Sequence, residues 1–144
     1  MIGDGGHGKV VRELIALTPD ARLEAVLDDR YAAQAGEAPH IGPDGELRGP
    51  VAAWRGLLEQ DAELAFVAAI GDNRVRHAIV RMLEAGGARF ARLIHPSAII
   101  SPRARIGPGA VVMARAVVQP DAVVGAHAIV NTGAIVEHDC VLGD

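Results

Sequence analysis

The chain has 144 residues, of which half are hydrophobic and only 3% aromatic, and its formal net charge is −4. This length allows one ordinary domain or two small ones. The acidic balance argues against a general nucleic-acid binder, which usually carries a basic patch. No apolar run reaches the roughly 18 residues that a membrane span needs, no signal-peptide pattern opens the chain, and a single cysteine excludes an internal disulfide. We therefore expect a cytoplasmic protein with neither nucleic-acid nor membrane partners.

A glycine-rich loop opens the chain and is followed by a helical pattern. Gly3, Gly5 and Gly8 have the G-x-G-x-x-G spacing, in which backbone N–H groups and a helix N-terminus face a phosphate. Only two residues precede the loop, which are too few for the usual strand, so either the start lies upstream or the first strand is lost. A P-loop is rejected because Val10 stands where magnesium binding needs Ser or Thr. The candidate binding residues are Gly5, Gly6, His7 and Gly8, although His7 could equally just shape the loop.

Two further apolar segments are expected to be strands of the same sheet. Residues 23–27 end at two acids that lie about 20 residues after the glycines, where a Rossmann unit places a ribose-binding carboxylate. Residues 64–70 are nearly all apolar, as in a central parallel strand, and lead into a polar turn whose aspartate could cap the next helix. Roles in turns and caps stay open for these polar residues. Because ligands bind beyond the carboxyl ends of parallel strands, we expect a shared binding rim. Its candidate residues are Asp28, Asp29, Asp72 and Asn73.

The remaining segments before residue 92 complete an α/β pattern. Residues 31–48 are rich in Gly, Pro and Ala and predict a loop with a short irregular strand. A helix is expected after Pro50, and a second one is expected to end at the Gly86-Gly87 pair. We therefore predict a Rossmann-like domain over residues 1–91.

From Ile94 to the end, an aliphatic residue recurs at every sixth position, and the fifth position of each hexad is Ala or, once, Cys140. A period of six fits neither a helix nor a simple strand and predicts a repeat architecture. Short strands joined by tight turns explain it, since each strand buries one large aliphatic side chain and each corner a small one. Residues 92–144 are thus predicted to form a parallel β-helix of about 2.7 coils, at three hexads per coil, with Cys140 packed inside.

Three segments together resemble a known family: GGHGKVV at the start, AIGDNRVR in the middle, and LIHPSAIISP running into NTGAIVEHDC. They resemble the sialic-acid and nucleotide-sugar acetyltransferases, the NeuD/PglD-like family of hexapeptide-repeat acyltransferases. In that family a small Rossmann-like domain precedes a left-handed β-helix. The left hand is implied by the resemblance alone, because parallel crossovers are otherwise almost always right-handed.

The resemblance implies an enzyme that moves an acetyl group from acetyl-CoA to the amine of a nucleotide-linked amino sugar, without a metal. The enzyme is expected to be a homotrimer with active sites between subunits, and the N-terminal domain is expected to hold the nucleotide. A sialic acid or sugar O-acetyltransferase is the close alternative. A catalytically incomplete nucleotide-binding trimerisation module is an alternative from a different class. An NAD-dependent oxidoreductase and a metal-dependent hydratase are weaker alternatives.

The resemblance also implies the catalytic residues. His138 matches the family's base, Asp139 the acid that orients it, and Asn131 and Glu137 are expected near acetyl-CoA and the acceptor. An imidazole with a pKa near ~6.5 is suited to take the proton that an attacking amine loses, and a carboxylate can fix its tautomer. The hexad register places His138 and Asp139 on an outward corner of the coil.

The length of the repeat region leads to a further expectation. Repeat proteins generally need about three units and a terminal cap. The resemblance implies more coils that would cover His138 and offer N–H groups to the acetyl carbonyl. We therefore expect the 144-residue chain to be a truncated form that binds acetyl-CoA poorly and turns over slowly, if at all.

Overall fold

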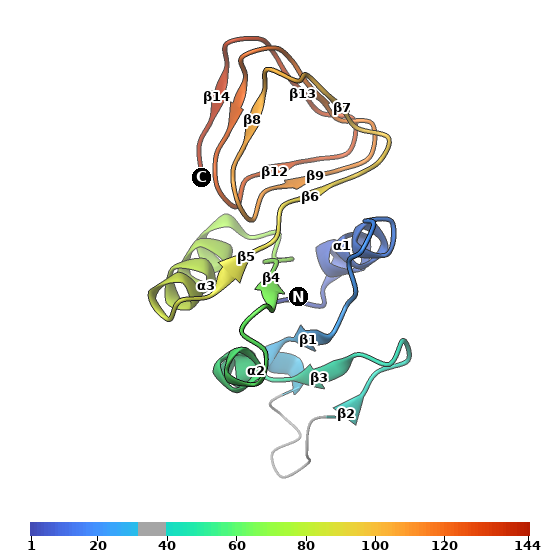
Figure 1. Cartoon of the computed structure of the whole chain (residues 1–144), viewed down its shortest axis with the longest axis vertical. Helices are drawn as coiled ribbons and strands as arrows, with labels where there is room; N and C mark the ends of the chain where they lie inside the picture. The colour runs from blue at the N-terminus through green and yellow to red at the C-terminus, as the bar shows by residue number, and fades with distance from the viewer. Residues whose placement is uncertain (32–39) are drawn as a thin grey trace. The chain divides into compact units, whose positions relative to one another are not determined.

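The computed structural model describes residues 1–31 and 40–144, which form two compact units. One unit comprises Met1–Arg12 and Arg22–Arg89, and the other Glu13–Ala21 and Phe90–Asp144. The first has α/β character, and the second contains a coil of short strands (Figure 1). Division into domains at residue 91 stays a prediction. Part of the loop expected over residues 31–48 lies outside the described residues.

Ile2 occupies the central strand position of the first unit. It bridges in parallel to Leu27 on one side and to Ala68 on the other. Its N–H donates to the carbonyl of Val67 at 2.8 Å, and its own carbonyl accepts from the N–H of Ala69 at 2.7 Å. The expectation that the residues before the glycine loop are too few to supply this strand is therefore wrong. A fully buried residue that is bonded to the chain on both sides serves as the strand.

The other strands extend this sheet on both sides. Strand β1 (Ala25–Leu27) pairs in parallel with β3 (Leu47–Gly49), and β2 (His40–Ile41) pairs antiparallel with β3. Beyond Ile2, β4 (Ala65–Phe66) pairs with β5 (Arg89–Phe90). The helical elements are α1 (Gly6–Ala16), η1 (Asp29–Tyr31), η2 (Val51–Ala53), α2 (Trp54–Gln60) and α3 (Asn73–Ala85). None of the described helices is long and apolar enough to cross a membrane.

Trp54 anchors the packing of α2 in this unit. Its ring meets the ring of Phe66 edge-on, with centroids 6.4 Å apart, an arrangement that aromatic pairs favour. Gly86, which follows α3, is needed for this packing because a Cβ there would lie 2.1 Å from the Trp54 ring. The glycine expected to end the helix therefore also makes room for the aromatic core.

The second unit contains a left-handed parallel β-helix, which confirms the parallel β-helix expected from the hexads and the hand implied by the family resemblance. Its strands are β6 (Leu93–Ile94), β7 (Ile99–Ile100), β8 (Arg105–Ile106), β9 (Val111–Val112), β10 (Val117–Val118), β11 (Val123–Val124), β12 (Ile129–Val130), β13 (Ile135–Val136) and β14 (Val141–Leu142). They form three sheets, ordered β13-β10-β7, β14-β11-β8 and β12-β9-β6. Each strand pairs with the strand 18 residues away, as Val117 does with Ile99 and Ile135. Val112, Val118, Val124 and Val130 fill the interior together with alanines.

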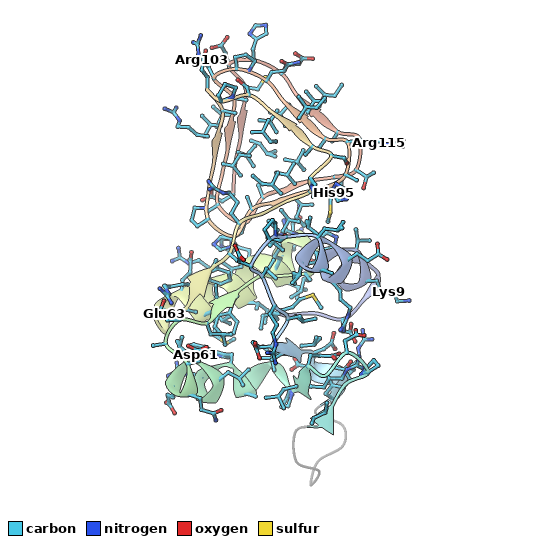
Figure 2. The ribbon with its side chains drawn as sticks, turned by 45° about the vertical axis from the view of Figure 1, so that its right-hand side comes forward. Lys9, Asp61, Glu63, His95, Arg103 and Arg115 are labelled. Atoms are coloured by element: carbon cyan, nitrogen blue, oxygen red, sulfur yellow. The ribbon has the colours of Figure 1, made fainter. Side chains whose placement is uncertain are left out.

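The corners of the coil have a repeating backbone conformation. The fourth position of several hexads has a positive φ, between 58° and 62° at Arg115, Asp121, His127 and Asp139. Asp is among the residues that adopt this region most readily. Corner side chains leave the coil, as Figure 2 shows for Arg103 and for Arg115, whose φ is positive, while aliphatic side chains fill its interior.

Cys140 departs from the packing expected for it. It occupies the hexad position equivalent to Ala122, which is fully buried, yet Cys140 is exposed. The prediction that Cys140 is an interior residue is wrong for the described chain, because no described residue covers that side of the last coil.

Helix α1 begins so close to the preceding loop that it leaves no room for a side chain at Gly8. A Cβ there would lie 2.7 Å from the carbonyl oxygen of Gly3, whereas a Cβ on Gly6 would meet nothing within 4 Å. We expect Gly8→Ala to lower the free energy of unfolding by about 1–3 kcal/mol, measured by urea denaturation. Gly6→Ala, the matched control, should be neutral or slightly stabilising. Equal stability of the two variants would contradict this contact.

Candidate functional site

The predicted rim residues of the first unit lie at one edge of its sheet. Ile2 runs parallel to both Leu27 and Ala68, so the segments that follow these three residues leave the sheet on the same side. These segments are the glycine loop, the turn after β1, and the turn before α3. The structure thereby brings three stretches that are distant in the sequence to one edge.

The glycine loop owes its shape to two close backbone contacts. Gly3 has φ +96°, and a Cβ there would lie 2.8 Å from the carbonyl oxygen of Ala69. Gly8 is equally tight against Gly3, whereas Gly5 and Gly6 are exposed and have open space around them. The loop thus brings the N-terminus of α1 to the sheet edge, where its N–H groups and dipole suit an anion.

His7 lies half-buried in the first turn of α1. Its Nε2 is buried and has no hydrogen-bond partner among the described residues. Burial, and then the nearby charge of Arg76, lower the pKa of His7, so its ring is neutral at pH 7. Arg76 itself donates to the carbonyl of Ile70 at 3.0 Å and to Oδ1 of Asn73 at 2.7 Å. The predicted residue Asn73 therefore already accepts a hydrogen bond from an arginine that sequence reasoning missed.

The three aspartates of the rim differ in what they bond. Asp28 accepts from the backbone N–H of Asp4 at 2.7 Å and from the N–H of Arg30 at 3.0 Å. Burial raises the pKa of the Asp28 carboxyl, but these bonds, together with the Arg30 guanidinium, outweigh burial and hold it below its usual value. Asp29 accepts from the N–H of Val51 at 3.2 Å, and Asp72 caps α3 through two N–H groups. Asp29 and Asp72 thus have structural roles, whereas Asp28 ties the turn after β1 to the glycine loop.

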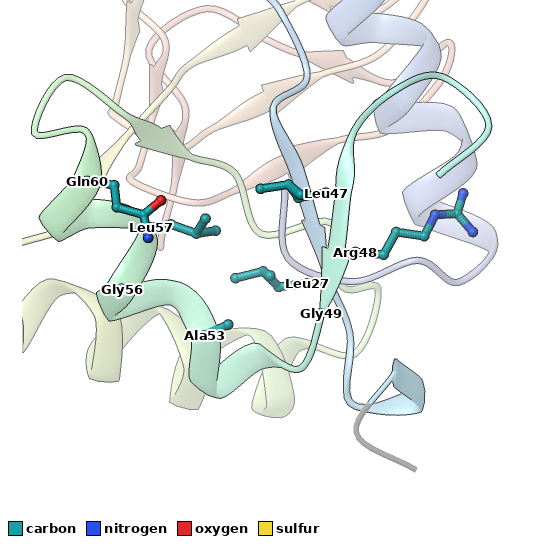
Figure 3. A pocket seen from close by; sticks show the side chains of 8 residues that line it. All are labelled: Leu27, Leu47, Arg48, Gly49, Ala53, Gly56, Leu57 and Gln60. Carbon is teal, nitrogen blue, oxygen red and sulfur yellow. The ribbon is translucent and has the colours of Figure 1, made fainter. Parts of the chain in front are cut away.

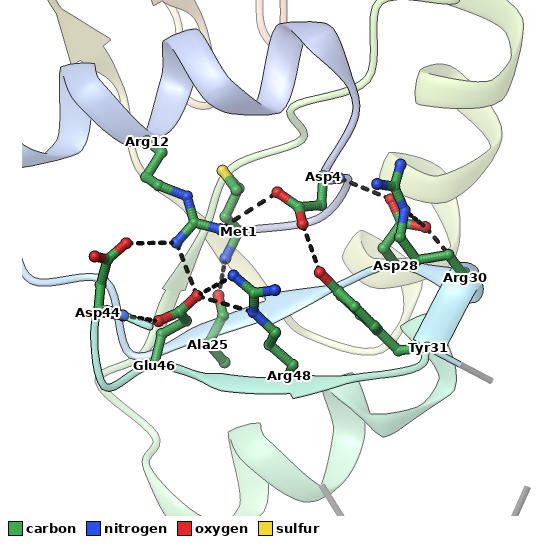
Figure 4. A network of polar contacts seen from close by, with 10 residues as sticks. All are labelled: Met1, Asp4, Arg12, Ala25, Asp28, Arg30, Tyr31, Asp44, Glu46 and Arg48. Atoms are coloured by element: carbon green, nitrogen blue, oxygen red, sulfur yellow. Dashed lines mark hydrogen bonds and ion pairs between the residues drawn. The ribbon is translucent and has the colours of Figure 1, made fainter. Parts of the chain in front are cut away.

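An ion-pair network lies beside the glycine loop, and sequence reasoning missed it (Figure 4). Glu46 is 1% exposed and accepts from Arg12 at 2.8 Å and from Arg48 at 2.9 Å. Burial alone would raise its pKa, but the bonds from Arg12, Arg48 and backbone amides outweigh it and lower the pKa of Glu46 to about 2. Arg12 also contacts Asp4 of the glycine loop, at 3.3 Å. No sequence motif joins these residues, because only the pairing of β1 with β3 and the path of α1 bring them together.

An apolar groove of about 470 Å³ lies between β3 and α2 (Figure 3). Sequence reasoning gave no sign of it. Its lining is mostly aliphatic, with Arg48 and Gln60 as the polar members. The lining residues are Leu27, Leu47, Arg48, Gly49, Ala53, Gly56, Leu57 and Gln60.

In the second unit, His138 and Asp139 form a hydrogen-bonded pair on a corner of the last coil. His138 Nδ1 lies 2.7 Å from Asp139 Oδ2, and the two side chains are 71% and 73% exposed. The bond to Asp139 raises the pKa of His138, as do the charges of Asp139 and, to a smaller extent, Glu137. The left-handed backbone at Asp139 turns its carboxylate off the coil. Because Nδ1 engages the carboxylate, Nε2 is the ring nitrogen left to exchange a proton with a substrate.

The other residues predicted around this pair are not all gathered beside it. Glu137 is exposed and precedes His138 directly. Asn131 is also exposed, but it lies on the preceding corner, at the other end of β13. Within one chain, Asn131 and His138 therefore occupy different corners of the coil.

Two other histidines of the coil have structural contacts. The ring of His127 meets that of Phe90 edge-on at 4.5 Å and lies over Gly109, where a Cβ would be 2.2 Å from Nδ1. His95 Nδ1 accepts from the N–H of Ser97 at 3.0 Å. Over residues 1–31 and 40–144, no group of three or more His, Cys, Asp or Glu residues is placed to hold a metal ion.

The His138–Asp139 bond makes a direct prediction for titration. In NMR spectra of the imidazole, the pKa of His138 should lie above 6.5, because protonation strengthens its bond to the carboxylate. Asp139→Asn removes that charge and should lower the pKa. Asp121→Asn is the matched control on the same corner, since the Asp121 carboxylate is held by Arg103 instead. If Asp139→Asn leaves the titration of His138 unchanged, the pair does not exist in solution.

Comparison with known proteins shows what the chain resembles. Residues 1–83 match the family model described as the PglD N-terminal domain. The chain is 46% identical over 108 residues to UDP-N-acetylbacillosamine N-acetyltransferase of Bacillus subtilis (strain 168). The aligned residues cover 74% of this chain and 47% of that protein. The chain thus spans about half the length of this curated relative.

Solved structures of similar fold are also named as acetyltransferases. The acetyltransferase domain of PglB from Neisseria gonorrhoeae FA1090, in complex with acetyl coenzyme A, superposes with a TM-score of 0.83 at 39% identity, over 99% of this chain and 65% of that one. A histidine-to-alanine mutant of GDP-perosamine N-acetyl transferase from Caulobacter crescentus, in complex with CoA and GDP-perosamine, gives 0.84 at 36%, over 99% and 63%. A match over more than half of the chain, together with these likenesses, settles the family. The chain belongs to the PglD-like family, whose model is described as the PglD N-terminal domain.

Proposed function

We propose that this chain serves as an acetyl-CoA-dependent N-acetyltransferase of a nucleotide-linked amino sugar. The observation that carries the proposal is the exposed His138–Asp139 pair, whose carboxylate raises the pKa of the histidine. A hydrogen-bonded imidazole and carboxylate is the arrangement that general-base catalysis uses. The names of the relatives support the class of reaction.

In the proposed mechanism, His138 removes a proton from the sugar amine as the amine attacks the thioester carbonyl of acetyl-CoA. A carbon–nitrogen bond forms, the carbon–sulfur bond breaks, and CoA leaves as a thiolate. The His138 imidazolium then returns the proton to the thiolate. Asp139 holds Nδ1 of the ring, so that Nε2 faces the amine, and it stabilises the imidazolium while the proton is there.

The surroundings of His138 fit an acyl-CoA. Strands β13 and β14, on either side of this corner, turn the exposed aliphatic side chains of Ile135 and Val141 outward, at 60% and 76% exposure. Such side chains suit the pantetheine arm, which combines apolar methylene groups with amides. Asn131 and Glu137 are proposed to line the same surface, with Asn131 contributing from its own corner.

The rim of the first unit is proposed to hold the nucleotide. The N-terminus of α1 would take the diphosphate through Gly5, Gly6, His7 and Gly8, and Asp28 the ribose. Asp29, Asp72 and Asn73 shape the same edge. We assign this role to residues 1–91 and acetyl transfer to residues 92–144. A single free cysteine fits a reducing compartment such as the cytoplasm.

The proposal is tested by following the acetyl group. The chain is incubated with labelled acetyl-CoA and UDP- or GDP-linked amino sugars, and the acetylated sugar is detected by mass spectrometry. His138→Ala should lower the rate by ~10²–10⁴-fold, whereas His77→Ala, an exposed histidine of α3, should leave it unchanged. Equal rates for His138→Ala and the unaltered chain would remove His138 as the base.

The same assay, together with binding measurements for UDP, GDP and acetyl-CoA, separates the alternatives. A chain that acetylates a hydroxyl of sialic acid, but no amino sugar, is an O-acetyltransferase. A chain that binds UDP or GDP but neither binds acetyl-CoA nor transfers its acetyl group is a nucleotide-binding module.

We also propose that the chain acts as a homotrimer through an outer face of its coil. The face formed by β13-β10-β7 presents Ile99, Val117 and Ile135 in one paired ladder, with Ile99 67% and Ile135 60% exposed. Contiguous apolar surface of this kind marks contact sites. A second copy would cover the ladder and bring its own corner residues beside those of the first copy.

The molecular mass of the assembly in solution tests the proposed homotrimer. We expect three copies by light scattering for the unaltered chain and single copies for Ile135→Arg, since a charge in the ladder cannot be buried without a partner. Ile41→Arg, which alters an isoleucine of β2 that is 72% exposed, should stay trimeric. A monomeric unaltered chain would overturn the proposal.

A further inference from the structure

Among the described residues of the first unit, Glu46 is the most buried charged side chain, and four hydrogen bonds fix its carboxylate. Arg12 of α1 donates to Oε1 at 2.8 Å, and the Nε and Nη2 of Arg48 donate to the same oxygen at 3.0 and 2.9 Å. The N–H of Asp44 donates to Oε2 at 3.0 Å. A Cβ on Gly42 would lie 2.3 Å from Oε1, so the backbone fits closely around this carboxylate.

The network continues from Glu46 to the glycine loop by two routes. In the first, the Nη2 of Arg12 contacts Asp4 Oδ1 at 3.3 Å. In the second, the Arg48 guanidinium lies 5.6 Å from the ring centroid of Tyr31, whose hydroxyl donates to Asp4 Oδ2. Both oxygens of Asp4 are thereby held; with the Arg48–Tyr31 contact, the hydrogen bonds that Figure 4 shows close into a ring.

Asp4 in turn connects the ring to the proposed nucleotide rim. It lies between Gly3 and Gly5, and its backbone N–H donates to Asp28 Oδ2 at 2.7 Å. The position of Asp4 therefore determines both the course of the glycine loop and the direction of the Asp28 carboxylate. Neither Glu46 nor Arg12 lies among the residues expected to touch a nucleotide.

From this chain of contacts we propose that Glu46 is a positioning residue, which acts through Arg12 and Asp4 to hold the glycine loop and Asp28 in the geometry that binds a nucleotide diphosphate. The proposal rests on the proposed function of the rim. A buried ion pair is weak evidence for stability, since desolvation offsets most of its attraction. A buried network of this kind is better explained by the geometry that it enforces, because each of its members fixes the direction of the next.

The first test needs no ligand. Glu46→Gln keeps the shape of the side chain but removes the charge that holds Arg12. We expect the backbone amide of Asp4 to exchange its hydrogen about tenfold faster or more, because its bond to Asp28 is no longer enforced. The amides of Leu27 and Ala69, which bond within the sheet to Met1 and Ile2, should keep their protection. Unchanged protection at Asp4, or an equal loss at all three amides, would overturn the proposal, since equal loss means that only global stability fell.

Two further variants serve as controls for the exchange measurement. Glu63→Gln makes the same chemical change in the exposed pair with Arg89 and should leave the Asp4 amide unchanged. If Glu46→Gln does not fold, Tyr31→Phe removes only the hydroxyl that bonds Asp4 and should accelerate exchange at Asp4 in the same sense. No acceleration in Tyr31→Phe would likewise count against the ring.

The second test measures binding by calorimetry well below the unfolding temperature, with UDP and GDP as probes. Glu46→Gln should weaken the binding of whichever nucleotide the unaltered chain takes by about tenfold, and should not alter its response to acetyl-CoA. Equal affinity in both proteins would overturn the positioning role. If the unaltered chain binds neither nucleotide, the proposed function of the rim fails, while the exchange measurement still decides whether Glu46 positions the loop.

Discussion

The first unit depends on the backbone hydrogen bonds of Ile2. Through them one residue joins β1 to the strand segment at Ala68 and makes the sheet continuous. The same bonds set where the chain leaves the sheet, so the glycine loop must emerge between the turns that carry Asp28 and Asn73. Because Gly3 and Gly8 touch backbone at distances that exclude a Cβ, the loop has little freedom of its own. The rim is therefore a consequence of strand pairing.

The ion pairs around Glu46 then hold in place the glycine loop that strand pairing brings to the sheet edge. Glu46 is buried among two arginines and a backbone amide, and its contacts run through Arg12 to Asp4. Attraction to the buried Glu46 carboxylate is strong because little water reaches it, and removing Glu46 would take from both arginines the buried partner that they share. Such a network has one favourable arrangement, which suits a loop that must present its N–H groups in a fixed direction. His7, neutral because of burial and Arg76, adds no charge to this edge.

The coil achieves rigidity in a different way. Every strand is bonded to a strand 18 residues away, and an interior of aliphatic side chains and alanines leaves only the corners to vary. A left-handed backbone at the fourth hexad position turns the corner at Asp139 outward, as it does at several other corners. His138 and Asp139 gain their exposure and their mutual bond from this geometry, and the stacked backbone beneath, through the N–H of Asp139 on Pro120, holds them in place.

The sequence by itself determined the coil, its register and the outward corner of His138 and Asp139, because a period of six leaves one arrangement that buries every sixth aliphatic. It also determined the glycine loop and the Asp72 cap, which are local signals. Only the tertiary structure decided that Ile2 serves as a strand and that Cys140 is exposed. The Glu46 network belongs to this second group as well. Its members are far apart in the chain and share no spacing, since long-range pairing of strands and burial of charge leave no periodic trace in a sequence.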